Sequence, residues 1–114
     1  MAHWDLLTNH ALVLIHVIDH PRSTLREIAA AAGITERAAL SILRALEEDC
    51  MISRQKEGRR NRYWVNIAAL LRHRRQGPYS VEEMAEALLR LSRRVAESAV
   101  SRDGVVRIDG ATLR

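Results

Sequence analysis

Cysteine is almost missing from this sequence: Cys50 is the only one among 114 residues, so neither a disulfide nor a cysteine zinc cluster can form within one chain. Phenylalanine is absent, so leucine, isoleucine, valine and alanine must build most of the hydrophobic core. The sequence contains no run of about 18 uncharged apolar residues, which a membrane-spanning helix needs, and its first residues do not resemble a secretion signal. We therefore expect a soluble cytoplasmic protein.

Motifs of catalysis are absent as well. The sequence has no glycine-rich phosphate loop, no Gly-x-Ser-x-Gly elbow and no His-Glu-x-x-His motif. Its acidic residues are of the kind found on helix surfaces. We therefore expect neither an enzyme nor a bound cofactor.

Positive charge is concentrated in the middle of the chain. The formal net charge is +4, but residues 1–21 carry no lysine or arginine, and residues 76–114 are balanced. The densest basic stretch runs from Arg54 to Arg75, with Glu57 as its single acidic residue. Such a stripe is typical of domains that bind a polyanion, most simply nucleic acid, although a merely solvated surface would explain it equally well.

The first periodic segment predicts a helix from about Thr8 to Asp19, just before Pro21. Its apolar residues surround most of the helix: Ala11, Leu12, Leu14, Ile15, Val17 and Ile18. This pattern predicts a helix that is buried on more than one side.

Two further helices are expected on either side of a short turn, residues 33–35. Thr24 and Glu27 have capping-box spacing at the start of a two-turn helix that Gly33 ends. Thr35 is the expected N-cap of the next helix. The residues of that helix predicted to face inward are Ala39, Ile42, Leu43 and Leu46, and those predicted to face outward are Glu36, Arg37, Ser41 and Arg44. A helix, a tight glycine turn and a second helix form the signature of a helix-turn-helix.

A β-hairpin is expected next. Residues 51–56 and 62–66 can each alternate as strands, and residues 57–61 form a polar loop between them. Tyr63 and Trp64 should point to opposite faces, one into the core. The fold class is therefore mainly α with a small β-hairpin wing, a winged helix-turn-helix, followed by a C-terminal helix.

Five stretches within residues 4–75 together resemble small bacterial winged-helix transcriptional regulators of the MarR/ArsR-like type: Leu7–Ala11, Leu25–Ala29, Gly33–Ala38, Ile42–Glu48 and Gly58–Tyr63. The resemblance implies sequence-specific binding of double-stranded DNA by a homodimer, with the third helix in the major groove and the wing on the backbone or in the minor groove. Cys50 stands where these proteins usually have glycine, so either Cys50 or Asp49 is expected to take the left-handed conformation.

The third helix supplies the first group of candidate DNA contacts. Thr35 and Glu36 lie at its N-terminus, where free amides and the helix dipole favour a phosphate. Arg37, Ser41 and Arg44 lie on one face, where an arginine can pair with guanine unless Glu47 or Glu48 neutralises it. Leu40 is expected either to touch a thymine methyl group or to pack under the wing.

The wing supplies the second group of candidate DNA contacts. Its four cations suit phosphate or a narrow minor groove: Lys56, Arg59, Arg60 and Arg62.

A separate amphipathic helix is expected within residues 76–101, beginning at a second capping box, Ser80 to Glu83. Its apolar stripe includes the candidate dimerisation residues Met84, Leu88, Leu91 and Val95. The stripe must be covered either by the first helix or by the same helix of a second copy, and both can coexist. Acidic residues precede basic ones along it, which favours antiparallel self-pairing over a membrane surface. Residues 102–114 are a tail without a structural prediction.

Two other functions compete with this interpretation. His16, Asp19 and His20 lie on one helical face and could bind a metal as in ArsR-like sensors, although helix-end histidines that satisfy carbonyls and the dipole are the stronger explanation. A winged helix can also serve as a protein-interaction module without touching DNA. We therefore expect a DNA-binding regulator, most simply a repressor that occupies a palindromic operator, with no bound metal.

Overall fold

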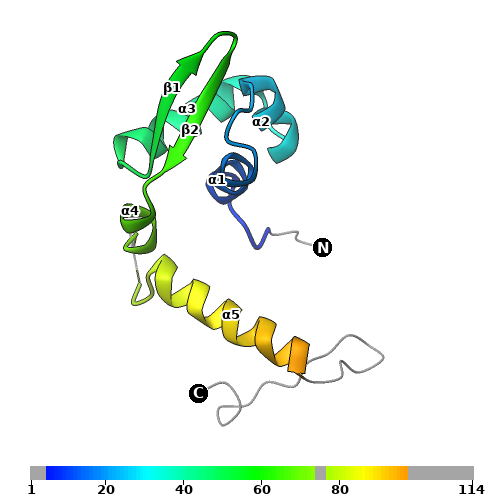
Figure 1. Ribbon diagram of the computed structural model, residues 1–114, viewed down its shortest axis with the longest axis vertical. Coiled ribbons are helices and arrows are strands. Elements are labelled where there is room, and N and C mark those ends of the chain that lie inside the picture. Colours follow the sequence, from blue (N-terminus) through cyan, green and yellow to red (C-terminus); the bar gives the residue numbers. More distant parts are fainter. Residues whose placement is uncertain (1–4, 74–76, 98–114) are drawn as a thin grey trace. The chain divides into compact units, whose positions relative to one another are not determined.

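The computed structural model describes residues 5–73 and 77–97 (Figure 1). The chain divides into two compact units, residues 1–70 and 71–114. The elements follow in the order α1 (Asn9–Asp19), α2 (Leu25–Ala32), α3 (Glu36–Glu48), β1 (Ile52–Glu57), β2 (Arg60–Val65), α4 (Ile67–Leu71) and α5 (Val81–Glu97). The protein is thus mainly helical, with one antiparallel hairpin after the third helix.

Threonine side chains begin the first three helices, as the sequence predicts for Thr24 and Thr35. The Oγ1 atoms of Thr8 and Thr35 each accept a hydrogen bond of 3.1 Å from the amide three residues later. At α2 the capping box is complete, because Thr24 accepts from the amide of Glu27 and the Glu27 carboxylate accepts from the amide of Thr24. These bonds satisfy amides that have no partner within a helix.

Left-handed residues end α2 and α3. Gly33 has φ of 68°, and the amides of Gly33 and Ile34 bond back to the carbonyls of the last turn of α2. Cys50 takes the same role after α3, with φ of 59°, while Asp49 stays at φ of −84°. Of the two residues considered for the left-handed position, Cys50 is therefore the one that adopts it.

The hairpin is longer, and its loop shorter, than the sequence suggests. The strands pair from Ile52 with Val65 to Glu57 with Arg60, so the predicted five-residue loop, 57–61, is wrong. Gly58 has φ of 62°, which lets the two residues 58–59 close the turn and leaves their neighbours in the ladder. Tyr63 is buried and Trp64 exposed, as the alternation predicts.

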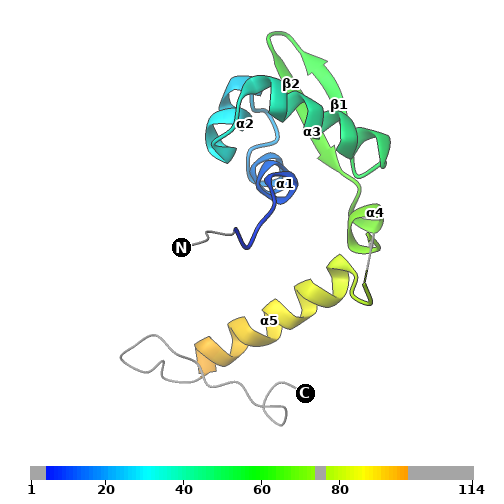
Figure 2. The same ribbon diagram turned by 180° about the vertical axis from the view of Figure 1, so that it is seen from behind.

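The hydrophobic core lies between α1, α2, α3 and the base of the hairpin. In both views the three helices are grouped together, with the hairpin in front of α3 in Figure 1 and behind it in Figure 2. The four predicted inward residues of α3 are all buried. The core residues are Val13, Val17, Ile28, Ala29, Ala39, Ile42, Leu43, Leu46, Met51, Ile52 and Tyr63.

Helix α1 buries one face rather than several. Val13 and Val17 are its buried residues, whereas Ile15 and Ile18 are 45% and 49% exposed. The main contacts of α1 are with α2, α3 and β2, and the two isoleucines stay exposed, so the predicted burial does not include all of its apolar residues. The exposed isoleucines leave apolar surface on this unit.

Helix α4 has no counterpart in the sequence prediction. Asn66 begins it, because its Oδ1 accepts a hydrogen bond of 3.2 Å from the amide of Ala69. Five residues are too few for a periodic pattern to be recognised, and the asparagine cap is the only local signal of this helix.

The second unit contains α5. The predicted capping box is present, since the amide of Ser80 donates to Glu83 Oε1 at 3.1 Å and Ser80 Oγ accepts from the amide of Glu83 at 3.3 Å. The expected extension of this helix to Ser101 and the tail at 102–114 lie outside the described residues. Among the helices in the described ranges, none has the length and apolar character needed to span a membrane.

Candidate nucleic-acid interface

The outward face of α3 brings together most of the candidate residues predicted on it. Arg37, Ser41 and Arg44 are exposed and line one open depression, and Leu40 lies half-buried in its wall. Ala45 and Glu48 complete the lining. Leu40 therefore belongs to this face rather than to the residues packed on the core.

The two arginines of this face are not neutralised by the glutamates at the end of α3. Within residues 5–73 and 77–97, no carboxylate lies within 4.0 Å of the guanidinium of Arg37 or Arg44. Glu47 instead lies 3.5 Å from Arg54 of β1. Both guanidinium groups are thus available to an external acceptor.

The N-terminus of α3 carries Thr35 and Glu36, both exposed. Thr35 acts as the cap, as predicted, and its hydroxyl accepts from the amide of Ala38. The helix dipole makes this end partially positive. It adjoins Arg37, so the positive end of the dipole and the α3 arginines lie on neighbouring surface.

The hairpin cations occupy different environments. Lys56 and Arg59 are exposed near the turn, and in the part of the chain that the structure describes neither pairs with a carboxylate. Arg62 lies 4.0 Å from Glu57, and its guanidinium stands 5.0 Å from the centroid of the Trp64 ring. This is a cation–π contact of the kind that holds an arginine against an indole.

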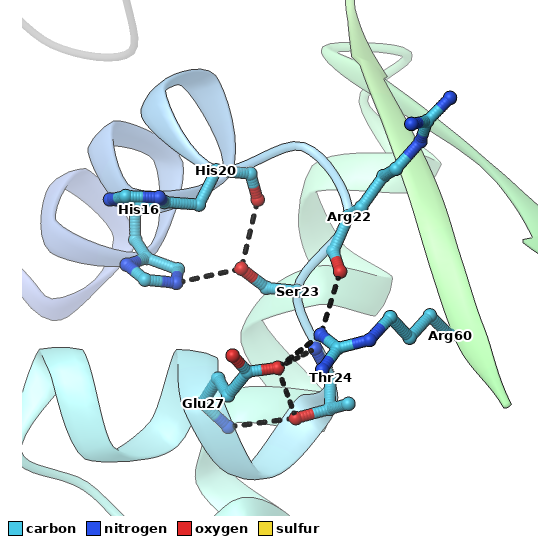
Figure 3. Close-up of polar contacts among 7 residues, drawn as sticks. All are labelled: His16, His20, Arg22, Ser23, Thr24, Glu27 and Arg60. Carbon is cyan, nitrogen blue, oxygen red and sulfur yellow. Dashed lines mark hydrogen bonds and ion pairs between the residues drawn. The ribbon is translucent and has the colours of Figure 1, made fainter.

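Arg60 is directed to the protein itself. Its Nη1 donates a hydrogen bond of 3.0 Å to the carbonyl of Arg22 and another to Oε1 of Glu27 (Figure 3). Arg60 is therefore exposed like Lys56 and Arg59, but unlike them it is bonded to residues outside the hairpin.

Glu27 is strongly biased toward its ionised form. The amide of Thr24 lowers the pKa of this carboxyl most, followed by the Thr24 hydroxyl and then by Arg60, and the pKa falls from 4.5 to about 2. The carboxylate is thus a permanent anion near neutral pH and a lasting partner for Arg60.

The predicted dimerisation residues are largely uncovered within the described structure. Met84, Leu88 and Val95 are 52%, 56% and 44% exposed, and Leu91 is half-buried. Leu89 and Tyr79, which lie outside the predicted set, add further exposed apolar surface to this unit. Leu89 lies about 100° around the helix axis from Leu88, so it falls outside the apolar stripe that periodicity identifies.

The histidine group considered as a metal site has other bonds. Ser23 Oγ donates to the carbonyl of His20 at 2.9 Å, so it accepts from His16 Nε2 at 2.9 Å (Figure 3). His16 and His20 stack with ring centroids 4.8 Å apart. Among the described residues, no three histidine, cysteine or acidic side chains converge as metal ligands.

The first unit also has an apolar depression that the sequence does not predict. It is lined by residues from α1, β2 and α4, including the exposed Ile18, Trp64 and Ile67. The sequence pattern predicts a first helix that is buried on more than one side, and this prediction hides the exposed surface at Ile18.

Comparison with protein-family models matched none of them to this chain, and comparison with curated proteins found no match.

Proposed function

We propose that residues 4–75 form a winged helix-turn-helix that binds double-stranded DNA in a sequence-specific manner, as in MarR/ArsR-like regulators. The observation that carries the proposal is the exposed face of α3, where Arg37, Ser41 and Arg44 lie together and neither guanidinium forms an ion pair with a carboxylate among the described residues. The basic middle of the sequence supports it, because a polyanion would be attracted to this unit.

In this proposal α3 enters the major groove. Arg37 and Arg44 each pair with O6 and N7 of a guanine, which contributes about 1–3 kcal/mol of discrimination per good pair. Leu40 contacts a thymine methyl group, and Ser41 serves either base type. The amides at Thr35 and Glu36 bind a phosphate, which sets the position of the helix along the duplex.

The hairpin acts as the wing. Lys56 and Arg59 reach phosphates beside the major groove or enter a narrow minor groove. Arg62 is held against Trp64 and adds positive potential to the same hairpin. The phosphate contacts strengthen binding to every sequence alike.

The active species is a cytoplasmic homodimer joined through α5. In α5 the acidic residues precede the basic ones, so antiparallel pairing of two copies places opposite charges side by side. The acidic residues are Glu82, Glu83 and Glu86, and the basic residues are Arg90, Arg93 and Arg94. Two α3 helices placed about 34–36 Å apart would read a palindromic site. Occupation of that site excludes polymerase, which makes the protein a repressor.

A second candidate function is a protein-interaction module. The apolar depression around Ile18, Trp64 and Ile67 supports it, since surface of this kind is common at protein contacts. This function does not need the cations of α3, whereas DNA binding does.

Salt dependence of binding to duplex DNA separates the two functions. With about six to ten phosphate contacts per dimer, log affinity should fall against log salt with a slope near −0.9 per contact. A flat salt response would contradict DNA binding and leave the protein-interaction module.

A further inference from the structure

Arg60 connects the hairpin to the helix that precedes α3. It reaches from β2 to the start of α2, where its Nη1 donates to the Arg22 carbonyl and to Glu27 Oε1 (Figure 3). The same carboxylate oxygen accepts from the amide and the hydroxyl of Thr24, at 3.0 and 2.9 Å. One oxygen therefore closes the capping box of α2 and holds a side chain of the hairpin.

The loop between α1 and α2 adds contacts to both strands of the hairpin. The amide of Tyr63 donates to the carbonyl of Pro21 at 2.8 Å, and the Arg22 side chain lies 3.5 Å from Glu57. The loop itself is fixed, because Ser23 is 3% exposed and bridges His16 and the carbonyl of His20. Arg60 is thus bound to a rigid support rather than to a mobile segment.

We infer that Arg60 is a positioning residue for DNA binding, which sets the hairpin on the body of the domain through Glu27 and does not itself bind phosphate. The inference rests on the proposed function and changes the role of one predicted contact residue. Both partners of Arg60 are already in place without DNA and share its Nη1, so a phosphate would have to compete with a carboxylate for this nitrogen. A hairpin held in its binding orientation has less freedom to lose when the complex forms.

Substitution of Glu27 separates the two roles of Arg60, because they predict opposite signs. Glu27→Gln keeps a capping-box acceptor but removes the anion that holds Arg60. If Arg60 positions the hairpin, Glu27→Gln weakens DNA binding by about fivefold, because the hairpin must be ordered on binding. If Arg60 binds phosphate, the same substitution releases it from competition and strengthens binding.

Arg60→Gln, the double variant and two controls complete the test. We expect Arg60→Gln to weaken binding as much as Glu27→Gln, the double variant to be no weaker than either, and the salt slope to stay unchanged. Glu27→Asp retains the charge but is shorter, so it also weakens binding. Arg59→Gln, at the exposed turn, instead reduces the salt slope by about 0.9 for each phosphate that the variant no longer neutralises.

A lower slope in Arg60→Gln, or tighter binding in Glu27→Gln, would overturn the inference. Amide hydrogen exchange of Tyr63 gives an independent readout without DNA, and faster exchange is expected in both single variants while both remain folded. Unchanged exchange in both would also overturn the inference. A protein that binds no DNA, yet shows faster exchange in these variants, would contradict the proposed function alone.

Discussion

At the scale of single residues, strain and charge are concentrated at a few positions. Cys50 adopts φ of 59° without being glycine, and the amides of Cys50 and Met51 bond back to the carbonyls of Glu47 and Leu46. These bonds close the end of α3, so the strain is tolerated because the last turn gains its partners. The strained residue lies two positions after the last residue of the helix that carries the candidate interface.

Replacing Cys50 by glycine should stabilise the protein. An L-residue in the left-handed region costs about 1–2 kcal/mol, which glycine avoids. Part of this gain in stability is offset because glycine loses more conformational entropy on folding. We expect Cys50→Gly to raise the free energy of unfolding by up to about 1 kcal/mol in urea titrations. Cys50→Ser, which keeps the side-chain constraint, should leave stability unchanged, and equal effects of both variants would argue against strain.

The lowered pKa of Glu27 makes a prediction about acid. A carboxyl whose pKa falls from 4.5 to about 2 on folding stabilises the folded state fully above 4.5, and this contribution is lost as the pH falls through about 2. The difference in melting temperature between the wild type and Glu27→Gln should be constant near neutral pH and shrink between pH 4.5 and 2. A difference that stays constant down to pH 2 would contradict it.

The Tyr63 hydroxyl is buried without a hydrogen-bond partner among the described residues. Tyr63→Phe removes a polar group that is no longer hydrated, so we expect unchanged or slightly higher stability, by up to about 1 kcal/mol in thermal unfolding. A loss of more than about 1 kcal/mol would show that the hydroxyl has a partner in solution.

At the scale of elements, both ends of α2 and the start of α3 were predictable, whereas α4 and the contacts between elements were not. Thr24, Gly33 and Thr35 mark their helix ends through bonds to neighbours in sequence, so local chemistry determines them. The outward face of α3 also follows from periodicity. The partner of Arg60 does not, because Glu27 is 33 residues away and only the packing of β2 beside the α1–α2 loop brings them together.

The two DNA-binding elements should respond differently to substitution. Arg37→Ala removes a base contact of α3, so it should weaken binding to the preferred site by about 1–3 kcal/mol and relax selectivity at one base pair. Arg59→Ala removes a phosphate contact of the hairpin and should weaken all sequences by a similar factor. Competition binding with substituted duplexes measures both, and identical profiles for the two variants would show that the roles are wrongly assigned.

At the scale of the whole molecule, the sequence predicted a basic unit followed by an amphipathic helix with an apolar stripe, but not the apolar surface left on the first unit. Periodicity predicts burial of Ile18, which the structure shows to be exposed. The apolar pattern of a helix shows which of its faces are hydrophobic, but not whether other elements pack against each of them. The sequence also predicts that Leu88 is covered, and within the described structure it is 56% exposed. A second copy is the cover that the proposed function supplies.

Dimerisation through α5 can be disrupted at its centre. Leu88→Glu puts a charge into the proposed apolar seam, so sedimentation should show a monomer at concentrations where the wild type is a dimer. Glu97→Ala, at the end of the helix, should remain dimeric. A dimer in both variants would place the interface elsewhere.

Selection from random-sequence duplex DNA tests the central claim, that the exposed face of α3 reads DNA, most directly. We predict enrichment of an inverted repeat with half-sites separated by about one helical turn, 10–10.5 base pairs, and loss of one conserved position when Arg37→Ala is used for the selection. Recovery of no preferred sequence, or of the same sequence by both proteins, would contradict the account.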